Sequence, residues 1–180
     1  MARHVRHPRA RRIRFEAMVQ APVDGRRILR LPAAASKQLS SRGQVAVNAT
    51  VDGQAFQTVI EPDGEFGHWM NVDEQAGATV TVELEPAEAW PEPRVPRDLR
   101  TALADAPPEV GALWEAITPM ARWEWVRWVN ETKNPQTRQR RVEVSLSKLG
   151  SGKRRPCCFN LAACTDPELS KSGKLVAPGA

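Results

Sequence analysis

The sequence has little of the side-chain chemistry on which most enzymes depend. It contains no tyrosine and only three histidines among 180 residues. It also carries no glycine-rich phosphate loop, no nucleophile-elbow motif and no helical pair of His or Glu at metal spacing. No two carboxylates stand out as a general acid and base. The sequence therefore predicts a protein that is not an enzyme and that uses no cofactor.

Long hydrophobic runs and a complete set of paired cysteines are also missing. No segment approaches the roughly 18 apolar residues that cross a bilayer. Six arginines near the N-terminus are followed by no apolar stretch, which argues against a secretory signal. The three cysteines, all near the C-terminus, cannot close a full set of disulfides. We therefore expect a soluble protein of the reducing cytoplasm with no membrane span.

Positive charge is absent from the middle of the chain. Residues 43–93 contain ten acidic side chains and no Lys or Arg, whereas residues 1–42 contain eleven Lys and Arg against two acids. Residues 132–155 are again basic, with eight Lys and Arg against one Glu. The sequence pI of about 9.6 thus comes from the flanks. The centre should repel phosphate, while the flanks could attract it.

Alternating apolar residues between residues 12 and 86 indicate β-strands. The run from Ile13 to Val19 has the period of two of a half-buried strand. Two later runs flank Asp52-Gly53, the preferred turn sequence of a type I′ hairpin. The pattern predicts six strands, at residues 12–20, 28–31, 45–51, 55–60, 68–72 and 79–84, and one or two helical turns at 33–40. Short strands separated by Gly and Pro turns are typical of a small barrel or sandwich.

Beyond residue 86 the apolar period changes from two to about 3.6. A proline-rich linker covers residues 87–96, and three to four short helices follow over residues 97–150. Thr118-Pro119 and Asn134-Pro135 are start signals, a capping side chain followed by proline. Residues 1–11 are predicted to be a basic disordered arm, and residues 151–180 an extended, partly disordered tail. The expected fold class is α+β, a small barrel followed by a helical bundle.

Several motifs resemble the YdeI/OmpD-associated proteins and their N-terminal domain of unknown function. The similar segments of the barrel are Leu31-Pro32, Arg42–Val47 and Val51–Gly53. Those of the helical part are Val95–Leu99, Trp125–Val129 and Lys133–Arg141. The order of these motifs over residues 12–155 is more specific than any one of them.

The resemblance implies a double-split β-barrel, distantly like the barrels of AbrB-type DNA-binding proteins, followed by a helical segment. It implies little about activity, since the family is linked only to bacteriocin protection or to an outer-membrane protein. The chain departs from the family pattern after Val72. There only Asp-Glu-Gln-Ala precedes Gly77, where the family usually has a longer loop and a short basic helix. The loss of that basic helix accounts for the acidic centre.

The predicted helix that begins at Thr118 is rich in tryptophan. One of its faces, expected to pack in the core, carries Ala121, Trp125, Trp128 and Val129. Trp123 lies off that face, with Arg122 and Arg127 close in sequence. It could therefore be exposed and stack on a base or fill a partner's pocket.

A basic run near the C-terminus is the sharpest candidate site. Its members are Arg138, Arg140, Arg141, Lys148, Lys153, Arg154 and Arg155, opposed only by Glu143. On a helix, part of this run forms a ridge that could contact the phosphates of a nucleic acid, or another acidic partner. The alternative is that the ridge docks on the protein's own acidic barrel.

Two further candidate sites rest on few residues. His68 and Trp69, neighbours on a predicted strand, could line a ligand pocket in the barrel or be ordinary strand residues. The cysteines Cys157, Cys158 and Cys164, with Asp166 close in sequence, could hold zinc. They could also respond to redox change, because nearby basic side chains lower thiol pKa values. Free reduced thiols are the alternative.

These features leave three functional hypotheses. The first is a non-enzymatic protein of the YdeI/OmpD-associated type that contacts an unidentified protein partner, in stress or bacteriocin tolerance. The second is a nucleic-acid-binding protein that uses the basic C-terminal helix and the N-terminal arm. The third is a small-ligand-binding barrel. The sequence carries no signal for an oligomeric state.

Overall fold

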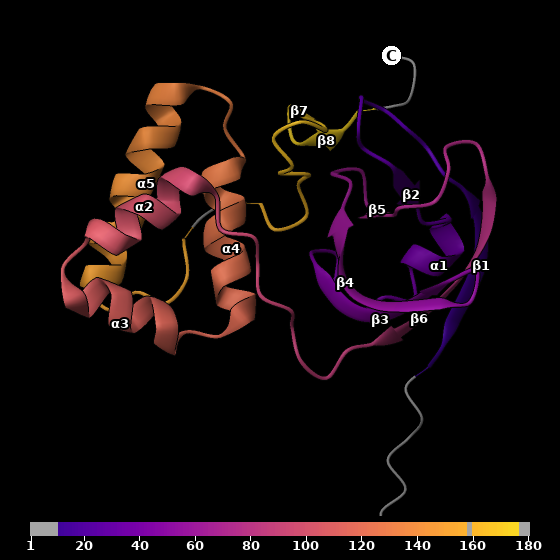
Figure 1. Ribbon diagram of the computed structural model, residues 1–180, viewed down its shortest axis with the longest axis horizontal. Helices are drawn as coiled ribbons and strands as arrows, with labels where there is room; N and C mark the ends of the chain where they lie inside the picture. Colours follow the sequence, from indigo (N-terminus) through magenta and orange to yellow (C-terminus); the bar gives the residue numbers. More distant parts are fainter. Residues whose placement is uncertain (1–10, 158–159, 177–180) are drawn as a thin grey trace, which may run out of the picture.

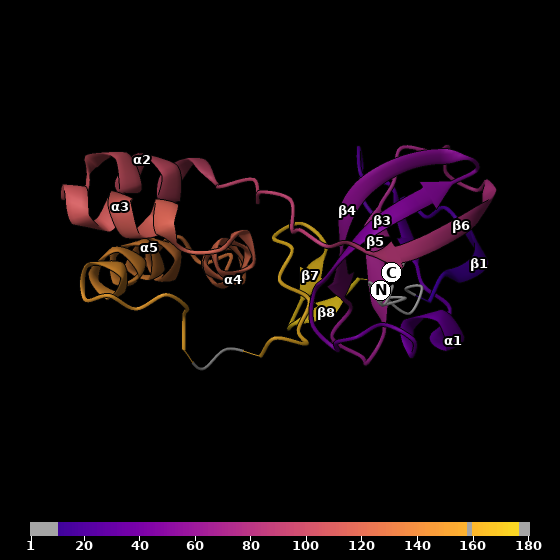
Figure 2. The ribbon, with the colours of Figure 1, turned by 90° about the horizontal axis from the view of Figure 1, so that it is seen from below.

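A computed structural model of the chain describes residues 11–157 and 160–176. It consists of a six-stranded antiparallel barrel and a group of four helices, joined by an extended linker (Figures 1 and 2). The predicted α+β class, a small barrel followed by short helices, is confirmed. The predicted N-terminal arm lies, except for Arg11, outside the described residues.

The barrel is built from strands in a non-sequential order. Its strands are β1 (Ile13–Met18), β2 (Ile28–Arg30), β3 (Val45–Val51), β4 (Gln54–Pro62), β5 (His68–Asn71) and β6 (Thr79–Pro86). They are arranged β1-β6-β3-β4-β5-β2, and all pairs are antiparallel. A bridge between Gln20 and Ile28 brings the end of β1 to β2, so the sheet almost closes. The short helix α1 (Ala33–Ser36) lies within the stretch where one or two helical turns were predicted.

Alternation along the strands fills the barrel with aliphatic side chains. On β3 the predicted inward set is buried, with at most 7% exposure for Val45, Val47, Ala49 and Val51. The β3–β4 hairpin turns at Asp52 and Gly53, whose φ angles are 46° and 88°. Both angles are positive, which is the type I′ geometry that the sequence predicted.

The helices pack around a core rich in tryptophan. They are α2 (Arg97–Asp105), α3 (Pro108–Ala116), α4 (Pro119–Asn130) and α5 (Pro135–Gly150). The two start signals are confirmed: the side chain of Thr118 accepts a hydrogen bond from the Ala121 amide (3.2 Å), and that of Asn134 accepts one from the Thr137 amide (3.0 Å). Trp125 is fully buried. Within the described part of the chain, no helix is both long enough and apolar enough to cross a membrane.

The C-terminal tail differs from the expectation of an extended segment. Residues 160–176 lie between the barrel and the helices in both views (Figures 1 and 2) and form a hairpin of β7 (Ser170–Lys171) and β8 (Lys174–Leu175). The buried members of one cluster, drawn from the barrel and the tail, are Ile28, Trp69, Cys164, Leu169 and Leu175. The tail has too few apolar residues for a pattern of its own, and it is ordered because the barrel offers apolar surface to cover.

Candidate binding cleft between the barrel and helix α4

Helix α4 packs on two sides. One is the core face with Trp125 and Val129. Its other face carries Met120, Glu124 and Arg127, spaced one and two turns apart. This face meets the barrel and the tail: the three residues line one hollow with residues of both, and α4 is the helix nearest to both in Figures 1 and 2. Glu124 is 7% exposed and Arg127 is 4% exposed. Charged side chains are seldom buried so far unless they are partnered, so each of these two must be accounted for.

Arg127 fastens the tail to α4. Its Nε donates a hydrogen bond to the Thr165 hydroxyl (3.2 Å), and its Nη2 donates to the carbonyl oxygens of Leu161 (3.1 Å) and Ala163 (3.0 Å). Burial lowers the pKa of its guanidinium, although an arginine remains charged in a protein. The tail follows its path here because its backbone carbonyls are bound by a buried cation.

Glu124 is held by the other basic side chain of this region. Arg155, in the tail, donates from Nε to Glu124 Oε2 (2.7 Å) and from Nη2 to Glu124 Oε1. This two-point geometry is the strong form of an arginine–carboxylate pair. The hydrogen bond with Glu124 is the main cause that raises the pKa of Arg155. Both oxygens of the Glu124 carboxylate are therefore engaged.

A second acid lies behind Arg127, on the barrel side. Glu61, near the end of β4, is half-buried, and the loss of water around its carboxylate raises its pKa from 4.5 to about 7. The charge of Arg127 opposes the rise, and so does that of Arg26, whereas Asp166 adds to it. Arg26 itself binds Asp166 (2.9 Å) and Glu168 (3.0 Å). The junction of barrel, tail and α4 is thus a network of buried and half-buried charges, with Glu168 at its exposed edge.

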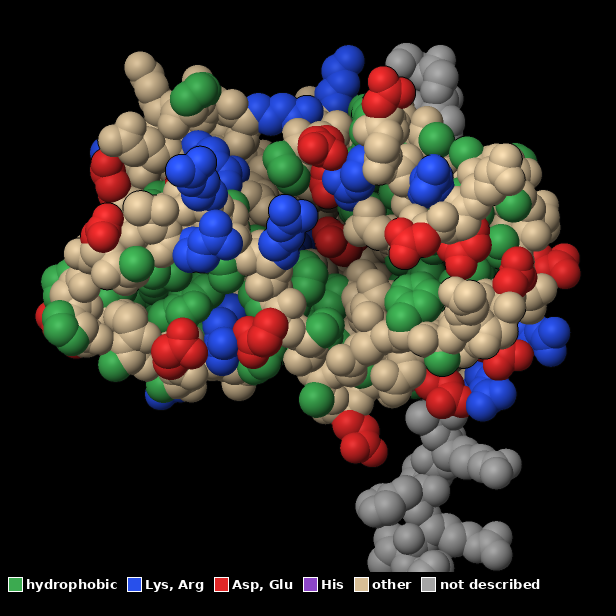
Figure 3. All heavy atoms as spheres, viewed as in Figure 1, with side chains coloured by type: hydrophobic (Ala, Val, Ile, Leu, Met, Phe, Trp, Pro, Cys, Tyr) green, Lys and Arg blue, Asp and Glu red, His purple; other side chains and the backbone are tan. Residues whose placement is uncertain are grey.

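A cleft of about 330 Å³ opens beside this network. Its walls come from the segment before and at the start of β3, the segment after β6, helix α4 and the tail. The lining residues are Ser40, Ser41, Gly43, Gln44, Val45, Ala46, Pro86, Ala87, Trp90, Met120, Glu124, Arg127, Arg155 and Leu161. Most of the lining is apolar, and its large apolar side chains include Trp90, Met120 and Leu161. Figure 3 shows a recess between the two parts of the molecule, with Lys and Arg side chains on its helical side.

One buried polar atom of the cleft lining lacks a partner among the described residues. The side-chain nitrogen of Gln44 is buried and has no acceptor among the described residues. A buried donor without an acceptor destabilises the protein, so such a group calls for a bound water or ligand. The cleft therefore combines apolar walls, a paired carboxylate, two arginines and one unused amide donor.

Both parts of the chain match known protein families. Residues 15–85 match a domain of unknown function (DUF1905). Residues 92–152 match the family described as "Bacteriocin-protection, YdeI or OmpD-Associated". The chain therefore has a DUF1905 segment followed by a YdeI/OmpD-associated segment. No curated protein matches it significantly. Gln44 comes from the DUF1905 segment and Met120, Glu124 and Arg127 come from the YdeI/OmpD-associated segment, so the cleft is built by both.

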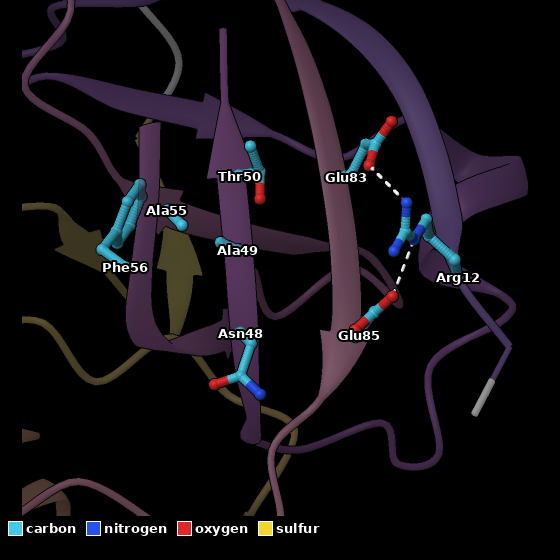
Figure 4. A pocket seen from close by; sticks show the side chains of 8 residues that line it. All are labelled: Arg12, Asn48, Ala49, Thr50, Ala55, Phe56, Glu83 and Glu85. Atoms are coloured by element: carbon cyan, nitrogen blue, oxygen red, sulfur yellow. Dashed lines mark hydrogen bonds and ion pairs between the residues drawn. The ribbon is translucent and has the colours of Figure 1, made fainter. Parts of the chain in front are cut away.

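A second hollow lies on the outer face of the barrel, over β3, β4 and β6 (Figure 4). It measures about 390 Å³. Arg12 lies at its edge, beside β6, and donates to Glu85 (2.7 Å) and Glu83 (3.1 Å), as Figure 4 shows. Its other lining residues are Asn48, Ala49, Thr50, Ala55 and Phe56. The Arg12 side chain remains 60% exposed, so water screens these charges. This open groove is a weaker candidate than the cleft between the two parts.

The structure uses most of the predicted basic ridge for internal contacts. Arg138 binds Asp98 (2.6 Å) and Arg141 binds Glu131 (2.7 Å). Arg141 also lies over the Trp128 ring, 5.2 Å from its centroid. The acids that pair with Arg138, Arg141 and Arg155 belong to the helical part, so the alternative of docking on the acidic barrel is wrong for these three. The reason is position, since α5 lies on the far side of α4 from the barrel (Figure 2).

Three members of the basic ridge remain at the surface. Arg140, Lys153 and Arg154 are exposed, and none of them forms an ion pair with another described residue. Lys148 instead contacts the Cys157 sulfur. The prediction of a nucleic-acid or acidic-partner contact therefore concerns these three side chains and remains a prediction.

The aromatic side chains predicted as candidate binding residues form hydrogen bonds within the protein. Trp123 is half-buried, and its indole donates to the Pro91 carbonyl oxygen (2.7 Å). His68 is 1% exposed; its ring nitrogens lie 2.6 Å from the Ser36 hydroxyl and 3.1 Å from the Gly43 carbonyl oxygen. The indole of Trp69, fully buried, donates to the Pro62 carbonyl oxygen (3.1 Å). Trp69 packs between the barrel and the tail, and neither His68 nor Trp69 lines either of the two hollows described above.

The cysteines do not form one site in the part of the chain that the structure describes. Cys164 is 1% exposed, and burial raises the pKa of its thiol to about 11. The prediction that basic neighbours lower the thiol pKa values is therefore wrong for Cys164, because burial dominates. Cys157 is exposed, with Lys148 Nζ 2.9 Å from its sulfur. Cys158 lies outside the described residues, and no group of three metal-ligating side chains occurs within them.

Of the charged residues that build the cleft, sequence reasoning named Arg155 but missed Glu124 and Arg127. The spacing of Met120, Glu124 and Arg127 is visible in the sequence and marks one helical face. A charged face is normally interpreted as solvent-exposed, and only the docking of the tail buries this one. Gln44 and Glu61 carry no sequence signal at all.

Proposed function

We propose that this chain is a non-enzymatic binding protein that holds a small apolar molecule in the cleft between the barrel and α4. The observation that carries the proposal is the cleft itself. Sites for small molecules typically occupy about 300–1,000 Å³ at the junction of two structural units, with mostly apolar walls and a few polar groups. The cleft, at about 330 Å³, has each of these properties.

The composition of the lining supports binding rather than catalysis. Nucleophilic catalysis needs a hydroxyl or thiol beside a base, and the lining includes neither histidine nor cysteine. Its one carboxylate, Glu124, is engaged through both oxygens by Arg155. The Ser41 hydroxyl accepts a hydrogen bond from the Gly43 amide (3.0 Å).

Fluorescent apolar probes test this function. Anilinonaphthalene sulfonate, or its uncharged analogue phenylnaphthylamine, should bind saturably to the folded protein with one site per chain. Met120→Glu should abolish this binding by placing an acid in the apolar cleft wall. Met18→Glu is the matched control, because Met18 is 57% exposed on the barrel and is no part of the cleft lining. Absence of saturable binding of both probes, or equal loss in both variants, would overturn the proposal.

A second candidate function, contact with a protein partner in the cytoplasm, draws on one other observation. Phe66, between β4 and β5, is 83% exposed and has a φ of 69°, an uncommon conformation for a bulky residue. Its loop is held by Asp63 Oδ1, which accepts from the amides of Glu65 (2.7 Å) and Gly67 (2.8 Å). An exposed aromatic on a rigid loop is typical of an interface anchor.

The family's name suggests bacteriocin or stress tolerance as the setting for this contact. If so, bacteria that depend on this chain for survival under bacteriocin should lose protection on Phe66→Ser. Phe56→Ser, at a 37% exposed position on the outer face of the barrel, should keep it. Equal survival with both variants would contradict a role for Phe66.

A further inference from the structure

We propose that the molecule bound in the cleft is an amphipathic anion, a small apolar body that carries one acidic group such as a carboxylate. This inference rests on the proposed function and specifies the chemical class of the ligand. It follows from the balance of charges and hydrogen-bond donors along the cleft wall.

The lining has more positive than negative charge. Among the lining residues, Arg127 and Arg155 outnumber the single acid, Glu124. Glu61 acts on Arg127 from outside the lining, and burial raises the pKa of this acid to about 7, so it offsets only part of the excess. An anion that enters the cleft is therefore attracted, whereas a cation is repelled.

Donors also outnumber acceptors on the side chains of the cleft wall. Arginine has five N–H groups, and Arg155 directs Nε and Nη2 to Glu124. Its Nη1 has no acceptor among the described residues, and its side chain is 53% exposed. The buried Nε2 of Gln44 is a second donor without an acceptor. Both residues line the same cleft, so the ligand group that suits them is an acceptor of several hydrogen bonds, as a carboxylate is.

The lining offers no free carboxylate to a cationic head group. Glu124 is the one carboxylate of the lining, and Arg155 occupies both of its oxygens. A cationic ligand would have to displace Arg155 from both oxygens of Glu124, which opposes its binding. The apolar part of the ligand would lie against Trp90, Met120 and Leu161.

The experiment compares two probes that differ chiefly in charge. Titrations of the full chain with anilinonaphthalene sulfonate and with phenylnaphthylamine should give a dissociation constant at least about tenfold lower for the anion. Gln44→Glu replaces the unused donor with an acid. It should raise the dissociation constant of the anionic probe by about tenfold or more and change that of the neutral probe by less than about twofold. Gln54→Glu, the same change at an exposed barrel position, should leave both unchanged.

Gln44→Leu removes the donor without adding charge and should reduce the preference for the anion, which keeps the test valid if Gln44→Glu does not fold. Equal affinity of the two probes for the wild-type chain, or an unchanged preference in both Gln44 variants, overturns the anionic ligand but leaves the cleft as a binding site. Failure of both probes to bind overturns the binding function itself.

Discussion

The barrel and the helical part use charged side chains in opposite ways. The barrel has an aliphatic core closed by backbone hydrogen bonds, and its ion pairs, such as Arg12 with Glu83 and Glu85, lie on the outer surface. The helical part and the tail instead bury Glu124 and Arg127 and bind Arg138 and Arg141 to neighbouring acids. On the helical side, charge is part of the packing.

This difference explains where the candidate site lies. A surface ion pair is screened by water and contributes little to stability or binding, so the groove around Arg12 is ordinary barrel surface. Buried charges need fixed partners, and fixed partners leave defined hydrogen-bond donors around them. The cleft forms where the neutral wall of the barrel meets the charged face of α4.

The largest effect is expected from loss of the buried cation. Arg127→Met should lower the free energy of unfolding by about 3 kcal/mol or more, because the carbonyls of Leu161 and Ala163 lose their buried donor. Arg12→Met, at the exposed pair of the barrel, should leave the melting temperature almost unchanged. Chemical denaturation of both variants checks the contrast, and equal losses would show that the two regions do not differ.

The attachment of the tail to the barrel is tested at two glycines. Gly64 (φ 79°) and Gly53 (φ 88°) are both left-handed, but only at Gly64 would an added Cβ collide with the carbonyl oxygen of Gly173 in the tail. Gly53→Ala should cost about 1 kcal/mol from its backbone conformation alone. Gly64→Ala should cost clearly more and expose Trp69, seen as a red shift of tryptophan emission. Matching spectra for the two variants would contradict a docked tail.

The buried acid at the junction predicts a pH dependence. The pKa of Glu61 is higher in the folded protein (about 7) than its ordinary value of 4.5. The folded state therefore holds the extra proton, and the contribution of Glu61 to stability is lost as pH rises from about 5 through 7, by on the order of 1–2 kcal/mol. Glu61→Gln should remove this decline.

The measurement is the difference in unfolding free energy between wild type and Glu61→Gln from pH 5 to pH 8, since other groups titrate equally in both. His68 is one such group, because burial lowers its pKa and favours folding at higher pH. A difference that does not change with pH would show that Glu61 is solvated like the acids on the barrel surface.

The smallest effect is expected from the exposed part of the basic ridge. Changing Arg140, Lys153 and Arg154 together to Ala should alter stability by no more than about 0.5 kcal/mol per site. Changing Arg138 and Arg141 to Ala should cost about 1 kcal/mol, because half-buried pairs with Asp98 and Glu131 are lost.

Nucleic-acid binding should also differ between the triple variant of Arg140, Lys153 and Arg154 and the double variant of Arg138 and Arg141. Fluorescence anisotropy with DNA and RNA at about 50 and 200 mM salt should lose any salt-dependent signal in the triple variant and keep it in the folded double variant. The reverse result would show that nucleic acid contacts Arg138 and Arg141 instead.

The sequence was sufficient for the local features of this fold. Alternation in β3, the Asp52-Gly53 turn and the capped starts of α4 and α5 each depend on a few adjacent residues, and each appears where it was predicted. The order of motifs along the chain was likewise enough to indicate its family.

Only the tertiary structure decided which charges are buried and what the tail does. Arg127 and Arg140 are equal in the sequence, yet one is 4% exposed and the other lies in solvent. Their difference comes from residues 160–176, which pack between barrel and helices through isolated contacts such as those of Cys164 and Leu169. Burial depends on segments far apart along the chain, and such contacts leave no period in the sequence. The cleft, assembled from four such segments, was therefore invisible until they were brought together.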